Sequence, residues 1–224
     1  MKIRTPLTRA KLRTHITYYF WAYLLIVAGS IFGWNLLYTV SAYRSPEDKR
    51  IDIYMQAPYV STEIAQAFVK PIWDERVPDT ETVETIMLSG DSQDYYTGMQ
   101  LTVYLMSQEG DIYLLSSADF KTYASQGFFL DLSPFVADGR LNTEGIDLSA
   151  GYVALTDENG LPVGERKLFG IPLSSLYGYM NGMGLDNRDL IACVTVYNGN
   201  EENVIKFLDG FLEAGHGEKP EGLL

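Results

Sequence analysis

A run of 23 residues without charge, close to the N-terminus, constrains this chain more than any other feature. The segment YYFWAYLLIVAGSIFGWNLLYTV, residues 18–40, contains no acidic or basic side chain. As an α-helix it extends about 34 Å, slightly more than the hydrocarbon core of a bilayer. Aromatic side chains such as Tyr18, Trp21, Trp34 and Tyr38 lie toward its ends, as is typical of membrane–water interfaces. The run therefore predicts a transmembrane helix over residues 18–40.

The charges on either side predict the orientation of this helix. Residues 1–17 contain five basic residues and no acidic one. Because basic flanks stay in the cytoplasm, residues 1–17 are expected inside and the rest of the chain outside. The sequence thus predicts a single-pass protein of the cell membrane with an extracellular main domain.

A cleaved signal peptide is the alternative interpretation of the same run. The small residues of TVSA, 39–42, would allow cleavage after Ala42. The apolar region of a signal peptide usually has about 7–15 residues, so the greater length here favours a retained anchor. Gly29 and Gly33 form a GxxxG pair that would suit self-association, although glycine is also common in membrane helices.

Composition restricts the chemistry of the rest of the chain. All 29 acidic residues and only twelve of the 17 basic residues lie beyond residue 40, which gives that part a formal charge of −17 and argues against nucleic acid as a partner. The single cysteine, Cys193, lies in the apolar run IACVTVY and is expected to be buried. The only histidines are His15 and His216, in opposite end segments, so we predict no Cys/His or Ser/His catalytic pair, no metal site and no cofactor.

Strand and helix patterns alternate after a polar spacer at residues 41–50. Strands are expected over 51–56, 82–88, 111–115 and 191–197. A helix after the first strand is predicted to bury Ile64, Phe68 and Ile72 and to end or kink at Pro71. The next helix is expected to start near Ser92, to end at Gly110 and to bury a stripe that comprises Tyr96, Met99, Val103 and Met106.

The stretch GDIYLLSSADF, which begins at Gly110, joins a strand directly to a helix. Ser116 and Asp119 form an S-x-x-D capping box, which satisfies the free amides of a new helix and allows a sharp turn. Gly127 suits the left-handed end of that helix. Successive strand–helix units predict an α/β fold with a parallel-rich sheet flanked by helices.

The C-terminal half continues with a hairpin and a helix. Asn159-Gly160 is a turn signal, so strands are expected on both sides, and DENG, 157–160, is interpreted as a hairpin tip rather than a calcium loop. The segment NVIKFLDGFL predicts an amphipathic helix. One domain is expected over residues 51–215, followed by a polar tail at 216–224.

Three segments in this order resemble the extracellular solute-binding proteins of ABC importers, of the sugar-binding, maltose-binding-like kind. They are EGDIYLLSSADFKTYASQGFFLDLSPFV, KLFGIPLSSLYG and CVTVYNGNEENVIKFLDGFL. The resemblance covers roughly residues 51–212. It implies a periplasmic-binding-protein-like fold, no catalytic activity and a sugar or an ABC transporter subunit as the partner.

Two features depart from the family pattern. VAGS, 27–30, has serine where lipid-anchored members have a cysteine, so a spanning helix would replace the lipid. Only a short stretch separates Ser175 from the last strand, where family members carry a second lobe. The chain is therefore expected to provide one lobe, which is half of a binding cleft.

The candidate ligand-binding residues follow the expected strand ends, because ligands of such sheets bind beyond the carboxyl ends of the strands. Their hydroxyl, amide, carboxylate and aromatic groups suit sugars. Each of them also has a local explanation as a cap or turn residue. A surface interaction or scaffold domain that has lost ligand binding is the alternative function. The candidates are Gln56, Tyr59, Ser89, Asp91, Ser116, Ser117, Asp119, Ser174, Ser175 and Tyr177.

Overall fold

The computed structural model describes residues 8–41, 43, 45–88, 95–195 and 199–218, with the side chains of residues 10, 11 and 95–97 left aside. The chain divides into two compact units, Met1–Arg44 and Ser45–Leu224.

The described residues of the first unit form one helix, α1 (Arg9–Ser41). It starts well before residue 18, because nothing between Arg9 and Tyr18 is a glycine or proline that would interrupt a helix. The part Leu12–Ser41 is long and apolar enough to cross a bilayer by length and composition, a property that signal sequences share.

The second unit is built on a five-stranded sheet with the strand order β2-β1-β3-β7-β6. β1 is parallel to both β2 and β3, while β7 is antiparallel to β3 and to β6. The predicted α/β fold with a parallel-rich sheet is therefore confirmed. The strands are β1 (Arg50–Met55), β2 (Thr82–Met87), β3 (Ile112–Ser116), β6 (Gly170–Pro172) and β7 (Leu190–Val194).

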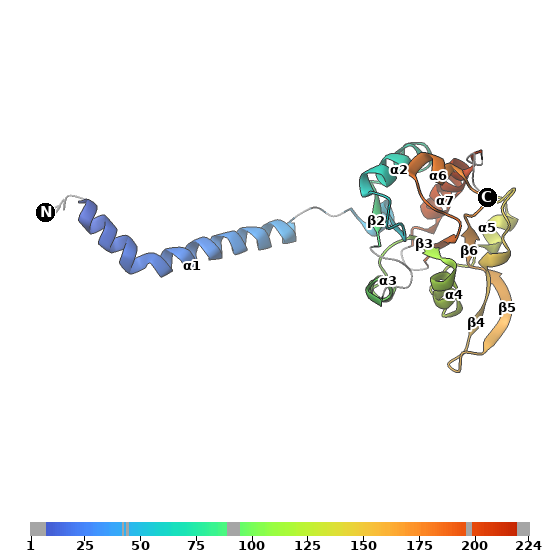
Figure 1. Cartoon of the computed structure of the whole chain (residues 1–224), viewed down its shortest axis with the longest axis horizontal. Coiled ribbons are helices and arrows are strands. Elements are labelled where there is room, and N and C mark those ends of the chain that lie inside the picture. The colour runs from blue at the N-terminus through green and yellow to red at the C-terminus, as the bar shows by residue number, and fades with distance from the viewer. Residues whose placement is uncertain (1–7, 42, 44, 89–94, 196–198, 219–224) are drawn as a thin grey trace. The chain divides into compact units, whose positions relative to one another are not determined.

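Helices cover both faces of this sheet (Figure 1). The remaining elements are α2 (Thr62–Arg76), α3 (Tyr95–Met106), α4 (Ser117–Ser125), α5 (Ser133–Ala137), α6 (Gly178–Met183), α7 (Glu201–Gly215) and the short 3₁₀ turns η1 (Glu47–Lys49) and η2 (Ser149–Gly151). Alternate residues of the strands enter two separate cores. Ile51 and Ile53 pack with α2, α6 and α7, whereas Tyr54 and Tyr113 pack with α3 and α4.

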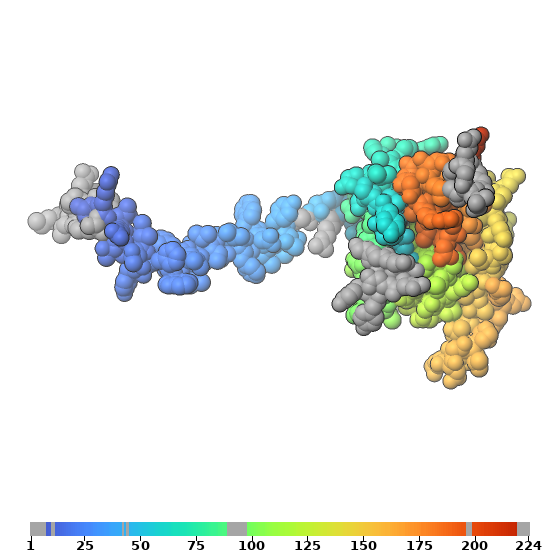
Figure 2. Space-filling view, viewed as in Figure 1, coloured from blue at the N-terminus to red at the C-terminus, as the bar shows by residue number. Residues whose placement is uncertain are grey.

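The predicted hairpin is confirmed and forms a separate two-stranded sheet. β4 (Tyr152–Thr156) pairs antiparallel with β5 (Pro162–Leu168), and Gly160 at the tip has a φ of 77°. The Asp157 carboxylate accepts hydrogen bonds from the amides of Asn159 and Leu161, both at 2.9 Å, which is the role of a turn residue. Figure 2 shows the hairpin projecting from the body of this unit.

The buried face of α2 differs from the prediction. Ala65, Val69 and Ile72 are buried, while Ile64 is 50% exposed. This orientation directs Gln66 to the outer edge of β2, where its amide donates to Val83 O (2.6 Å) and accepts from Thr85 N (3.2 Å). Because β2 is an edge strand, these backbone groups need such partners.

Of the two outcomes predicted for Pro71, an end or a kink of the helix, the end is wrong, since α2 continues to Arg76. A proline removes the donor for the carbonyl four residues earlier, here that of Ala67. Ala67 and Pro71 are both exposed, so water can replace that donor.

The stripe predicted for α3 is wrong as well. Met99, Val103 and Met106 are exposed, and the buried residues are Leu101 and Leu105. Tyr96 and Ser92 lie outside the side chains that the structure describes. The segment is apolar nearly all round, so its periodicity could not select one face.

The end of α3 differs from the prediction too. Gln108, with a φ of 58°, occupies the left-handed position that we expected Gly110 to fill. Gly110 instead allows a close approach, since a β-carbon there would lie 2.5 Å from the Tyr54 ring.

Candidate functional site

One edge of the five-stranded sheet collects the predicted ligand-binding residues. The parallel strands β1, β2 and β3 end at this edge, and β6 ends there too, because two antiparallel pairings through β7 restore its direction. The eight described candidates lie at or just after the ends of β1, β3 and β6, and the segment before β7 adds Asn187 and Asp189. Ser89 and Asp91 lie outside the described residues, so their geometry stays a prediction.

Gln56, Ser116 and Asp119 form one hydrogen-bonded group at this edge. The Gln56 side chain accepts from Ser116 N (2.6 Å) and donates to Asp119 Oδ2 (2.7 Å). Ser116 Oγ accepts from Asp119 N (3.2 Å) and donates to Asp119 Oδ2 (3.1 Å). The three residues bind one another, so the Gln56 amide and the Ser116 hydroxyl are already engaged.

Ser116 is the N-cap of α4, as the sequence predicted. The backbone N–H of Ser116 donates to the Gln56 side chain rather than to the Asp119 carboxylate, so the capping box is closed by the residue that follows β1. Gly127, with a φ of 83°, follows the end of α4, which confirms the predicted helix end. The strand can therefore run straight into a helix, because the Ser116 and Gln56 side chains and the backbone carbonyl of Asp189 accept from the free N–H groups at the junction.

Ser117 belongs to the contact between β3 and the segment before β7. Its N–H donates to Asp189 O at 2.9 Å, and its hydroxyl donates to the same oxygen at 3.4 Å. This geometry explains Ser117 as a residue that joins two loops.

The loop after β6 presents the most accessible hydroxyls of the candidates. Ser174 and Ser175 are exposed in a turn, and Tyr177 is half-buried at the start of α6. The buried Asn187 holds this loop in place, because its amide donates to Leu173 O and to Leu176 O (2.9 Å). Sequence reasoning missed Asn187, since its partners are backbone atoms that carry no sequence signal.

Tyr59 differs from the other candidates in its exposure. It lies in the turn after β1, and 98% of its surface is accessible. An aromatic ring with this exposure is available for stacking on a flat partner such as a sugar ring.

The strongly perturbed buried groups lie away from this edge, on β1, β3 and β7. Burial raises the pKa of Tyr54, Tyr113 and the Cys193 thiol, which keeps them neutral. Cys193 is buried, as predicted. Among the described residues, no group of three or more histidine, cysteine or acidic side chains is placed to hold a metal ion. The candidate edge thus offers hydroxyls, a carboxylate and a ring.

A comparison with known proteins found solved structures that are similar to part of this chain. No model of a protein family and no curated protein matches the sequence. An extracellular solute-binding protein of family 1 from Alicyclobacillus acidocaldarius is 18% identical, with a TM-score of 0.41 over 55% of this chain and 27% of that chain. An N-glycan transport solute-binding protein from Streptococcus pneumoniae, solved with Man5GlcNAc, is 19% identical, with a TM-score of 0.36 over 55% of this chain and 24% of that chain.

Other neighbours include an enzyme. Thiaminase I from Bacillus thiaminolyticus is 17% identical, with a TM-score of 0.32 over 55% of this chain and 28% of that chain. This chain thus spans about a quarter of the length of the solved proteins that it is similar to. These solved proteins include extracellular solute-binding proteins, the family that the sequence motifs resemble.

Proposed function

We propose that this chain is a membrane-anchored, extracellular module of the solute-binding-protein type that binds carbohydrate at the carboxyl edge of its sheet and assists an ABC-type importer. The observation that carries the proposal is the placement of the candidate residues. The segments that follow β1, β3 and β6 all begin at one edge of the sheet, and they carry the exposed Tyr59, the Asp119 carboxylate and the hydroxyls of Ser174 and Ser175.

The hydrogen bonds at this edge refine the roles of the candidates. Gln56 and Ser116 position the Asp119 carboxylate rather than contact ligand, because their own polar groups are engaged. Tyr59, Ser174 and Ser175 remain accessible and would provide the stacking ring and the hydroxyl contacts. No residue of the proposed site has a catalytic role.

The site is tested by saturation-transfer NMR of the full chain with a panel of oligosaccharides. Tyr59→Ala should abolish the transfer to sugar ring protons, because the stacking surface is lost. Tyr152→Ala, in the hairpin, is the matched control and should leave the transfer unchanged. Equal transfer in wild type and Tyr59→Ala would show that sugar binds without the Tyr59 ring and would overturn the proposed site. No transfer to any oligosaccharide in either protein would favour the scaffold function over carbohydrate binding.

The anchor is tested separately by sequencing the N-terminus of the protein from membranes. A retained helix predicts the native N-terminus, because the apolar run is too long for an ordinary signal peptide. A new N-terminus at Tyr43 would show that the segment is removed.

A further inference from the structure

Asn35 is the only side-chain amide in the uncharged run of residues 18–40. It lies six residues from the middle of that run, which is about 9 Å along a helix. Half of a bilayer's hydrocarbon core is about 15 Å thick, so a spanning α1 places this amide inside the hydrocarbon region. This placement rests on the membrane insertion proposed above.

The hydroxyls of Thr39 and Ser41 find acceptors within α1, but the Asn35 amide does not. Thr39 Oγ1 donates to Asn35 O (2.9 Å), and Ser41 Oγ donates to Leu37 O. The side-chain amide of Asn35 has no hydrogen-bond partner within the described part of the chain. An amide left without a partner in hydrocarbon is costly, so this group needs one from another molecule.

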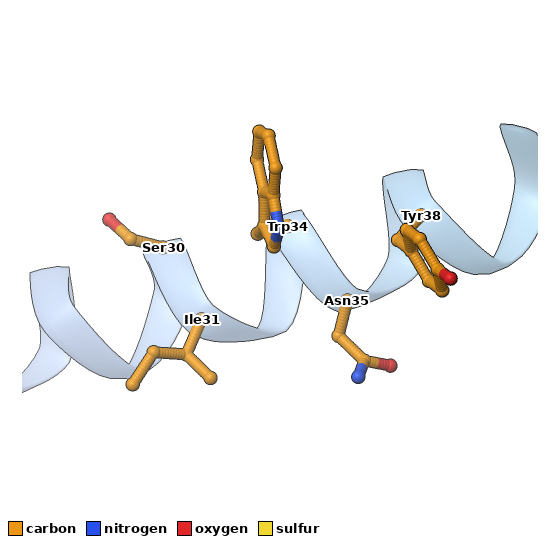
Figure 3. A pocket seen from close by; sticks show the side chains of 5 residues that line it. All are labelled: Ser30, Ile31, Trp34, Asn35 and Tyr38. Carbon is orange, nitrogen blue, oxygen red and sulfur yellow. The ribbon is translucent and has the colours of Figure 1, made fainter.

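The surroundings of Asn35 are open to such a molecule. Figure 3 shows a shallow hollow along α1 lined by Ser30, Ile31, Trp34, Asn35 and Tyr38, with Asn35 and Ile31 pointing to the same side. At about 100° per residue, Ile31 lies about 40° from Asn35 around the helix axis. The amide therefore lies on a face that a second helix can approach.

We propose that α1 pairs with the α1 of a second copy of this chain through Asn35. An asparagine amide carries both a donor and an acceptor, so two copies related by a two-fold axis satisfy each other with two equal hydrogen bonds. This self-complementarity identifies a second copy as the partner, because one residue type completes both sides of the contact.

The Asn35 face is distinct from the GxxxG pair. Gly33 lies about 200° from Asn35 around the helix, on the opposite side. A β-carbon at Gly29 or Gly33 meets no atom within 4 Å, so neither glycine is needed for packing within the chain. Pairing through the Asn35 face and pairing through the glycine face would therefore bring different residues of the two helices into contact.

Disulfide crosslinking in the full chain distinguishes the two faces. Single variants Ile31→Cys and Leu36→Cys, in phosphatidylcholine vesicles with a membrane-permeant oxidant, report on the Asn35 face and on the glycine face respectively. The native Cys193 is fully buried, and the chain without an added cysteine serves as the blank. We expect crosslinked dimer from Ile31→Cys and little from Leu36→Cys.

Second-site variants test the amide itself. Asn35→Leu should lower the Ile31→Cys dimer by about fivefold or more, while Asn35→Gln, which keeps donor and acceptor, should retain it. Gly33→Leu is the matched control and should have no effect. Crosslinking through Leu36→Cys that Gly33→Leu abolishes, or an Ile31→Cys dimer insensitive to Asn35→Leu, would overturn the inference.

An alkaline carbonate wash separates this inference from the proposed anchor. Protein that resists the wash but forms no dimer refutes the pairing alone. Protein that is washed off refutes the spanning helix, and the pairing with it.

Discussion

At the scale of single residues, the group formed by Gln56, Ser116 and Asp119 decides how the candidate site is interpreted. The sequence predicted the cap formed by Ser116, because the capping box is local. It could not predict that Gln56 closes the box, since Gln56 lies 60 residues earlier and its partner is a backbone amide. The cap and the site share residues, so loss of stability and loss of binding must be measured separately.

Replacing Ser116 with alanine should lower the free energy of unfolding by about 1 kcal/mol, because the N-cap acceptor of α4 is lost. Ser117→Ala is the matched control, since its hydroxyl makes only a 3.4 Å contact to Asp189 O, and it should change little. Urea unfolding followed by circular dichroism measures both. Equal effects of the two variants would contradict the capping role.

Asp52 on β1 provides a pH-dependent prediction. Burial raises the pKa of its carboxyl, against the opposing effect of Arg50, whose Nε lies 2.8 Å from Asp52 Oδ2, while Oδ1 has no partner among the described residues. A raised pKa in the folded state means that the contribution to stability is complete below the unfolded pKa of about 3.9 and is lost as pH rises through the folded pKa.

Asp52→Asn, which cannot ionise, should therefore gain stability relative to wild type as pH rises from about 4 to 7. The difference between the two unfolding free energies is the quantity to follow, because the carboxyls with lowered pKa values contribute equally to both proteins. If the unfolding free energy of Asp52→Asn minus that of wild type stays constant or falls over this range, ionisation of Asp52 does not destabilise the folded protein.

At the scale of elements, strands and helices were predictable where a local signal chose them. The hairpin follows from Asn159-Gly160, and α7 follows from its amphipathic pattern. The buried faces of α2 and α3 were not predictable, because tertiary contacts chose them. Gln66 turns toward the edge of β2, and Leu101 and Leu105 fill the core beside Tyr54 and Tyr113.

Close packing between α6 and the end of α7 makes Gly178 a sensitive position. A β-carbon at Gly178 would lie 2.5 Å from the backbone oxygen of Ala214, and backbone cannot move away as a flexible side chain does. Gly178→Ala should therefore destabilise the protein by about 1–3 kcal/mol in urea unfolding.

Gly98 in α3 is the matched control for this substitution, because no atom lies within 4 Å of its β-carbon position. Gly98→Ala should stabilise the protein by up to about 1 kcal/mol through helix propensity. Stabilisation by both variants would show that α6 and α7 are not closely packed.

At the scale of the whole molecule, the order of the elements was more predictable than their pairing. The sequence predicted a parallel-rich sheet and a last strand over 191–197, but not that β7 lies antiparallel between β3 and β6. That insertion matters for function, because it brings the loop after β6 to the same edge as the loops after β1 and β3. One sheet edge without a second lobe leaves a ligand partly in water, which limits affinity.

The measurement that tests this account most directly is a calorimetric titration of the full chain, in phosphatidylcholine nanodiscs, with a panel of oligosaccharides. We predict saturable binding of at least one oligosaccharide with a Kd in the millimolar range by order of magnitude, because one lobe buries about half of the ligand. A micromolar Kd would contradict the open half-site, and no heat of binding at tens of millimolar sugar would contradict carbohydrate recognition itself.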